Sequence, residues 1–183
     1  MALRRAYTPI GSAALLLILL ALGSCGNTAP PTSPVTSLPT IPSEEDSDSP
    51  WVKCRELFTS SGDPKQDVGL LGRACAARNK QHPLTGIHEG QQTENDAVDR
   101  YTFAAAGSGK CYRVIGAGEQ GVLDLDVQLI DPDGESVATD NSKTPYPMAP
   151  ATEPVCLKKT GIYTVEVSVY RGSGHYAVQV WTN

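Results

Sequence analysis

The sequence predicts a mainly β protein, an antiparallel β-sandwich with one short helix before its strands. Three observations support this fold class. After residue 95, apolar and polar residues alternate along the chain, with the period of half-buried strands. Glycine and proline turns interrupt these segments at short intervals, as in antiparallel all-β domains. Between residues 51 and 95, the helical signal is a single capped segment that begins at Asp63.

Residues 1–24 are expected to form a lipoprotein signal peptide. The basic pair Arg4 and Arg5 precedes an apolar run over residues 13–22, which is shorter than the roughly 20 residues of a membrane-spanning helix. The run ends in Leu22-Gly23-Ser24-Cys25, the pattern of a lipobox. We therefore expect cleavage before Cys25 and lipidation of this cysteine. The alternative is an ordinary signal peptide that is cut near Ser24 and releases a free secreted protein.

Residues 25–50 are expected to be a disordered linker. They are rich in Pro, Ser and Thr, lack aromatic residues, and carry an acidic cluster over residues 44–48. Acyl chains on Cys25 would hold the following domain at a membrane through this linker. The residue after the cysteine is Gly26. It is not an aspartate, which at this position would resemble an inner-membrane retention signal. We therefore expect a bacterial cell envelope protein, located at the outer membrane.

The charge balance argues against one class of partner. The chain has 15 basic and 20 acidic residues, and its formal net charge is −5. Nucleic-acid-binding domains carry a basic patch that attracts the phosphate backbone. A mildly acidic chain lacks this feature, so the sequence predicts no nucleic-acid partner.

The four cysteines besides Cys25 are expected to form two disulfides, because an exported protein folds in an oxidising compartment. Metal binding is the alternative, although no C-x-x-C pair is present. Reduced, buried thiols are a third interpretation. The four residues are Cys54, Cys75, Cys111 and Cys156.

Residues 51–95 are expected to form a helical front piece. Asp63 can cap a helix whose first residue is Pro64, and Gln66 completes the pattern of a capping box. Apolar residues then recur at helical spacing as far as Cys75, and the pattern fades near residue 79. A Cys54–Cys75 disulfide would hold this short amphipathic helix on the sandwich.

Residues 96–183 are expected to form the sandwich itself. If Tyr112 points into the core, Cys111 points outward, and the same alternation places Cys156 outward. Two outward cysteines on neighbouring strands can be bridged, so Cys111–Cys156 is the expected pair. The expected strands are 98–103, 111–115, 122–130, 135–139, 155–158, 162–169 and 175–181.

Six short segments between residues 96 and 181 together form a pattern of strands and turns. They are Tyr101-Thr-Phe103, Gly109-Lys-Cys-Tyr112-Arg-Val114, Leu123-Asp-Leu-Asp-Val127, Asp131-Pro-Asp-Gly134, Gly161-Ile-Tyr163-Thr-Val165 and Gly174-His-Tyr176-Ala-Val178. Through these segments the region resembles the bacterial pre-peptidase C-terminal (PPC) domain. The resemblance implies a jelly-roll-like β-sandwich that accompanies a secreted enzyme and, in some members, binds matrix, carbohydrate or calcium. The front piece and the cysteines at 111 and 156 depart from the family pattern.

Asp124 and Asp126 are the candidate metal ligands. They lie two residues apart on an expected strand, so both carboxylates project from one face. Carboxylate oxygens are ligands that calcium prefers, so a calcium site is one interpretation. The other is a polar outer face beside an Asp-Gly turn. No other cofactor is expected.

Tyr146 is the candidate binding residue. It lies in a long turn over residues 141–154, in which prolines at positions 145, 147, 150 and 154 restrict the backbone. A rigid loop that presents an aromatic ring suits recognition. Equally, the prolines can serve only to limit the entropy of the unfolded chain.

The sequence predicts a protein that is not an enzyme. It contains neither a G-x-S-x-G nor an H-E-x-x-H motif, and none of its three histidines lies in a known catalytic pattern. We expect a membrane-anchored lipoprotein that binds an envelope protein or glycan. The alternative function is an accessory or regulatory domain that acts in trans on an envelope or secreted enzyme.

Overall fold

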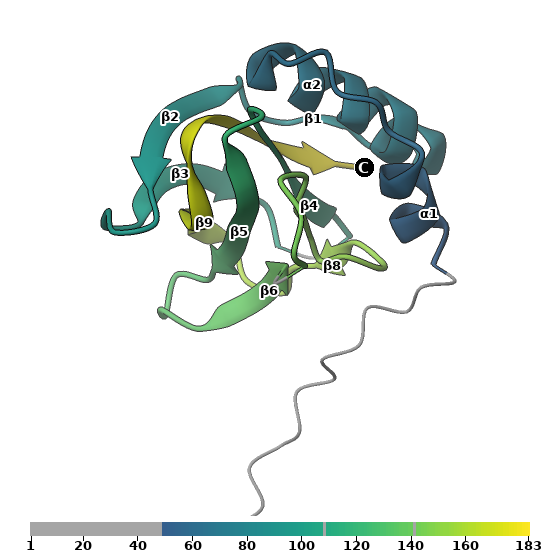
Figure 1. Ribbon diagram of the computed structural model, residues 1–183. Helices are drawn as coiled ribbons and strands as arrows, with labels where there is room; N and C mark the ends of the chain where they lie inside the picture. Colours follow the sequence, from purple (N-terminus) through teal and green to yellow (C-terminus); the bar gives the residue numbers. More distant parts are fainter. Residues whose placement is uncertain (1–48, 108, 141) are drawn as a thin grey trace, which may run out of the picture. The chain divides into compact units, whose positions relative to one another are not determined.

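The structure is a computed structural model that describes residues 49–107, 109–140 and 142–183 (Figure 1). The predicted signal peptide, the lipidation site Cys25 and the linker as far as residue 48 lie outside the described residues. Within the described ranges, no helix has the length and apolar character needed to cross a membrane.

Short helical elements come first in the described chain, and strands follow. The helical elements are α1 (Pro50–Glu56), α2 (Pro64–Leu71), the π-helical turn η1 (Gly72–Ala76) and the 3-10 turn η2 (Ala77–Asn79). The strands are β1 (His82–Pro83), β2 (His88–Thr93), β3 (Asp99–Ala105), β4 (Cys111–Gly118), β5 (Val122–Ile130), β6 (Ser136–Asp140), β7 (Met148–Ala149), β8 (Val155–Cys156) and β9 (Gly161–Thr182).

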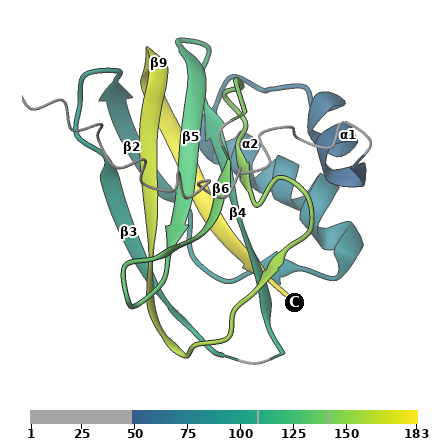
Figure 2. The same ribbon diagram turned by 90° about the horizontal axis from the view of Figure 1, so that it is seen from below.

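The long strand β9 joins the two layers of the sandwich. Its first half pairs with β3 and β5, and its second half pairs with β1, β2 and β4, in each case antiparallel. Gly172, with φ +95°, lies where the strand passes from one layer to the other. Figure 2 shows β9 running through the molecule between these partners. The alternation of residues predicted two separate strands here, over 162–169 and 175–181, but Gly172 and Gly174 let one strand bend without ending.

Two apolar cores flank the layer that contains β4. The inner core lies between the two β layers and contains the alternating aromatic and β-branched residues of β4, β5 and β9, such as Tyr112, Val127 and Tyr163. The second core lies between this layer and the helices and includes Trp51, Leu71 and Trp181. The fold class is therefore the predicted antiparallel β-sandwich, with helices covering one face.

The front piece differs from the expectation of one helix. Asp63 accepts hydrogen bonds from the backbone N–H groups of Lys65 and Gln66, so the predicted cap forms at α2. A second helix, α1, begins at Pro50 after the N-cap Ser49. The front piece also contributes β1 and β2, which pair with β9. Seven residues are too few for a stable isolated helix, so α1 depends on its packing and its disulfide.

Both expected disulfides are present. Cys54 of α1 is bonded to Cys75 of η1, and Cys111 of β4 is bonded to Cys156 of β8. In the second pair the two cysteines lie directly opposite each other across antiparallel strands, as the alternation argument required. The first disulfide joins the two helical segments of the front piece.

Candidate binding site

A surface hollow of about 370 Å³ lies between α1 and the loop that follows β6. Its volume falls in the range of small-molecule sites, although the hollow is open to solvent. Its walls combine two aromatic rings with charged and hydroxyl groups. The lining residues are Arg55, Glu56, Phe58, Ser142, Lys143, Thr144 and Tyr146.

Helix α1 forms one wall because three features hold it against the sheet. The hydroxyl of Ser49 accepts a hydrogen bond from the backbone N–H of Trp51 at its N-terminus. The Trp51 side chain is buried in the core between helices and sheet. The Cys54–Cys75 disulfide adds a covalent link to η1. The helix therefore has a fixed position beside the loop.

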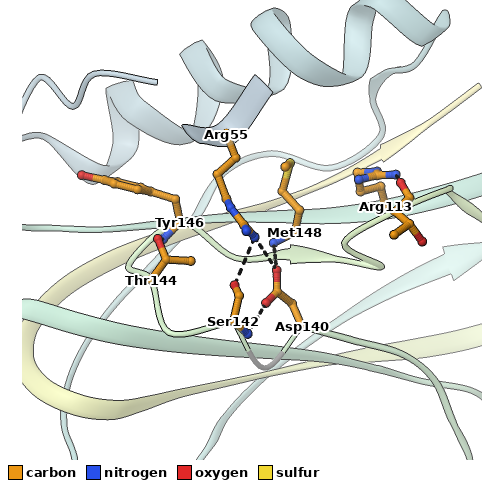
Figure 3. Close-up of polar contacts among 8 residues, drawn as sticks. Arg55, Arg113, Asp140, Ser142, Thr144, Tyr146 and Met148 are labelled. Atoms are coloured by element: carbon orange, nitrogen blue, oxygen red, sulfur yellow. Dashed lines mark hydrogen bonds and ion pairs between the residues drawn. The ribbon is translucent and has the colours of Figure 1, made fainter. Parts of the chain in front are cut away.

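The buried carboxylate of Asp140 connects the two walls (Figure 3). One oxygen pairs with Arg55 Nη1 at 3.4 Å and also accepts a hydrogen bond from the backbone N–H of Met148. The other oxygen accepts from the N–H of Ser142 at 2.7 Å. Arg55 also donates to Ser142 Oγ at 3.1 Å. One carboxylate thus joins α1, the start of the loop and β7.

Tyr146, the residue predicted to bind a partner, lies in the opposite wall. It is partly buried, and its ring meets Phe58 edge to face, with 5.3 Å between the ring centroids. Its backbone N–H donates to Thr144 Oγ1 at 3.2 Å. The tyrosine packs against the second core and also lines the hollow. Tyr146 therefore helps to pack the second core and also presents part of its side chain to the hollow.

The predicted proline-rich turn is docked on β4. The carbonyl of Pro145 accepts a hydrogen bond from Gly118 N–H, and that of Pro147 accepts from Gly116 N–H. Gly116 has no Cβ, which allows this contact, because a Cβ there would lie 2.8 Å from the Pro147 ring. The loop around Tyr146 is thus held along the edge of the sheet.

Arg113 is a buried cation that the sequence analysis did not single out. Its guanidinium lies 3.7 Å from the centroid of the Trp51 ring and donates to the carbonyl of Thr152. Burial lowers the pKa of Arg113 to about 9, although Glu153 and Asp140 act in the opposite direction. Alternation along β4 points Arg113 away from the inner core, toward the other face of the strand. Trp51 of α1 covers the side chain on that face, so Arg113 is buried. The alternation pattern alone could not show that a helix packs there.

The candidate calcium ligands Asp124 and Asp126 lie on β5. Asp124 is 4% exposed and Asp126 is partly exposed. Burial, with the nearby charges of Asp124 and Asp140, raises the pKa of Asp126 to about 6. Asp140 is already paired with Arg55. Among the described residues, no group of three or more His, Cys, Asp or Glu side chains is arranged to hold a metal ion. The calcium prediction therefore rests on the two aspartates alone.

Comparison with known proteins finds a likeness in structure and none in sequence. No family model matches the sequence, and a search of the curated proteins finds no similar sequence. Among solved structures, the chain is similar to the 1.0 Å crystal structure of the pre-peptidase C-terminal domain of the collagenase from Bacillus anthracis. The TM-score is 0.42 at 22% identity, over 53% of this chain and 89% of that one. This likeness assigns no ligand or activity to the chain.

Proposed function

We propose that this protein is a lipoprotein of the bacterial envelope that acts as a non-catalytic binding module for a protein or glycan. Cys25 would carry the lipid anchor, and the outer membrane is its proposed location. The observation that supports binding is the hollow in which Phe58 and Tyr146 lie beside the charged groups of Arg55 and Lys143. Aromatic residues and arginine are enriched where proteins bind their partners.

The rigidity of the walls supports the same role. Binding costs less free energy when the contacting side chains are already held in position. The Cys54–Cys75 disulfide holds one wall, and the contacts of Asp140 hold the other. The hollow is thus built before a partner arrives.

Leu57 favours a protein as the partner. Its side chain is 85% exposed, and it lies in the chain between two lining residues, Glu56 and Phe58. A large exposed leucine beside an aromatic hollow extends the apolar area that a second protein can cover. An envelope or secreted enzyme that this domain assists in trans would be one such partner.

The proposal is tested by crosslinking and co-purification of the full chain from its own cells. The wild-type chain is compared with Cys25→Ala, with Leu57→Ser and with the control Ile162→Ser, which changes another exposed aliphatic residue, 58% exposed. We expect one stoichiometric partner for wild type and for the control, and its loss for Leu57→Ser. Acylation of the wild-type chain, detected by mass spectrometry, should be absent in Cys25→Ala. Equal recovery from Leu57→Ser and wild type would contradict binding at the hollow.

A further inference from the structure

A second hollow, of about 340 Å³, lies between η1 and the strands β1 and β9. In Figure 1, β1 passes beneath the helical segment that contains α2. The hollow is open to solvent, and it shares no lining residue with the hollow around Tyr146. Arg73 and His82 are the basic side chains in its walls, and apolar side chains such as Ile87 line the rest.

The hollow lies in a stretch of the surface that we call the basic segment, residues 70–84. No acidic residue occurs in it, although the chain as a whole has a formal net charge of −5. Arg73, Arg78 and Lys80 are all exposed. None of the three forms an ion pair with another residue of the described ranges. Their charges are therefore available to an anionic partner.

The local backbone places basic groups on both walls of the hollow. Arg73 of η1 extends back over Gly69, where a Cβ would lie 3.4 Å from its Nη1, so the glycine leaves room for the guanidinium. Lys80, with φ +60°, ends the helical segment and turns the chain toward His82 of β1. An anion that enters the hollow would thus meet Arg73 on one wall and His82 on the other.

Two exposed leucines flank these basic residues. Leu70, near the end of α2, is 37% exposed, and Leu84, directly after β1, is 41% exposed. A single exposed leucine is ordinary on a protein surface. Leucines next to arginine and lysine, however, are typical of surfaces that lie in the interface of a membrane, where the apolar groups reach the acyl chains and the cations meet the headgroups.

We propose that the basic segment docks on an anionic phospholipid surface, with a headgroup phosphate held between Arg73 and His82. This inference rests on the proposed envelope location, because an anchor at Cys25 keeps the domain within the length of its linker of a membrane. A tethered surface binds at high effective concentration, so a modest attraction is enough. An acidic protein has the same charge but lacks this advantage, so a membrane is the better match.

The strength of the attraction can be stated from the number of cations. Each lysine or arginine near an anionic leaflet strengthens binding about fivefold, so Arg73, Arg78 and Lys80 together give about a hundredfold. An anionic membrane repels the rest of a net acidic chain, so the basic segment determines which side of the domain faces the lipid. The hollow around Tyr146 shares no residue with that side and stays available to its partner.

The test is co-sedimentation of residues 25–183, carrying Cys25→Ala, with lipid vesicles. These residues include the whole described chain, and the substitution removes the acylation site, so the result is independent of lipidation and of the partner at the Tyr146 hollow. Vesicles of phosphatidylcholine and phosphatidylglycerol in equal parts should bind about a hundredfold more strongly than phosphatidylcholine alone. Binding should be lost in about 1 M salt, which screens charges beyond about 3 Å.

Charge-reversal variants locate the docking surface. Arg73→Glu/Arg78→Glu should weaken binding to the anionic vesicles at least about twentyfold. The matched control is Lys158→Glu/Arg171→Glu, which changes the net charge by the same amount at two other exposed residues. The control should bind almost as wild type, and thermal melts of both variants should match that of wild type.

A fluorescence measurement is independent of the charge changes. Leu84→Trp should show a blue shift with the anionic vesicles, and Ile162→Trp, which is placed at another exposed position, should show none. The proposal is overturned if anionic vesicles bind no better than neutral ones, if the control variant loses as much binding, or if both tryptophans shift equally. Binding of soluble polyglutamate that depends on Arg73 and Arg78, without vesicle binding, would overturn it in favour of an acidic protein.

Discussion

Replacing Asp140 with alanine is expected to lower the free energy of unfolding by about 3–4 kcal/mol. The Asp140 side chain is 0% exposed, and it bonds Arg55, Met148 N–H and Ser142 N–H. The change removes the acceptor of two buried backbone N–H groups and one ionic partner of Arg55, and each buried polar group that loses its partner costs about 1–3 kcal/mol. Arg55 retains its contact with Ser142 Oγ, so we take about 3–4 kcal/mol for the sum.

The assay is urea unfolding at pH 7, followed by tryptophan fluorescence. The matched control is Glu89→Ala. Glu89 forms an ion pair with Lys65 at 2.8 Å, shorter than the pair of Asp140, but the side chains are 58% (Lys65) and 52% (Glu89) exposed. Water and salt screen the charges of an exposed pair, so this control should be almost neutral. If Asp140→Ala lowers the free energy of unfolding no more than the control does, burial does not determine how much the Arg55–Asp140 pair stabilises the fold. Additive effects of Asp140→Ala and Arg55→Met would refute their coupling.

Three further outcomes are expected. Asp126→Asn should stabilise the fold by about 1 kcal/mol at pH 8 and by nothing below pH 4. The pKa of Asp126 is about 6 in the folded chain and lower in the unfolded chain, so the wild type loses stability as the pH rises from about 4 to 6. An equal stability difference in thermal melts at pH 4 and pH 8 would contradict this. Replacing Cys54 and Cys75 together by serine should cost about 3 kcal/mol in chemical denaturation, since the disulfide closes a loop with a sequence separation of 21, and an unchanged midpoint would argue against it. Gly72→Ala should cost at least about 1–3 kcal/mol, because the new Cβ would lie 2.1 Å from the Trp181 ring; a thermal melt equal to wild type would show that the ring moves freely.

Much of the sandwich could be predicted because it depends on patterns among residues that are close together in the chain. Alternation places Tyr163, Val165 and Val167 on one face, and all three lie in the inner core. The same alternation predicted the Cys111–Cys156 pair, which lies in register across β4 and β8. The cap at Asp63 depends on residues next to it in the chain. Each of these features needs only the neighbours of a residue.

The rest depends on contacts between distant residues. Arg55 and Asp140 are separated by 85 residues, and neither position carries a pattern that names the other. Helix α1 is too short for a periodic signal, and its cap at Ser49 lies in a segment whose composition resembles the linker. Tyr146 was predicted as a binding residue from its loop alone, whereas its position in the wall of the hollow and its contact with Phe58 require α1 to be in place.

The hollow between α1 and the loop around Tyr146 is proposed to bind an envelope partner. Site-specific photo-crosslinking in living cells tests it most directly, with the photoreactive residue placed at Leu57 and, as the control, at Ile162; both side chains are exposed. We expect one defined crosslinked product from position 57 and none from position 162, and we expect Lys143→Glu to abolish that product. The same products from both positions, or none from position 57, would contradict it.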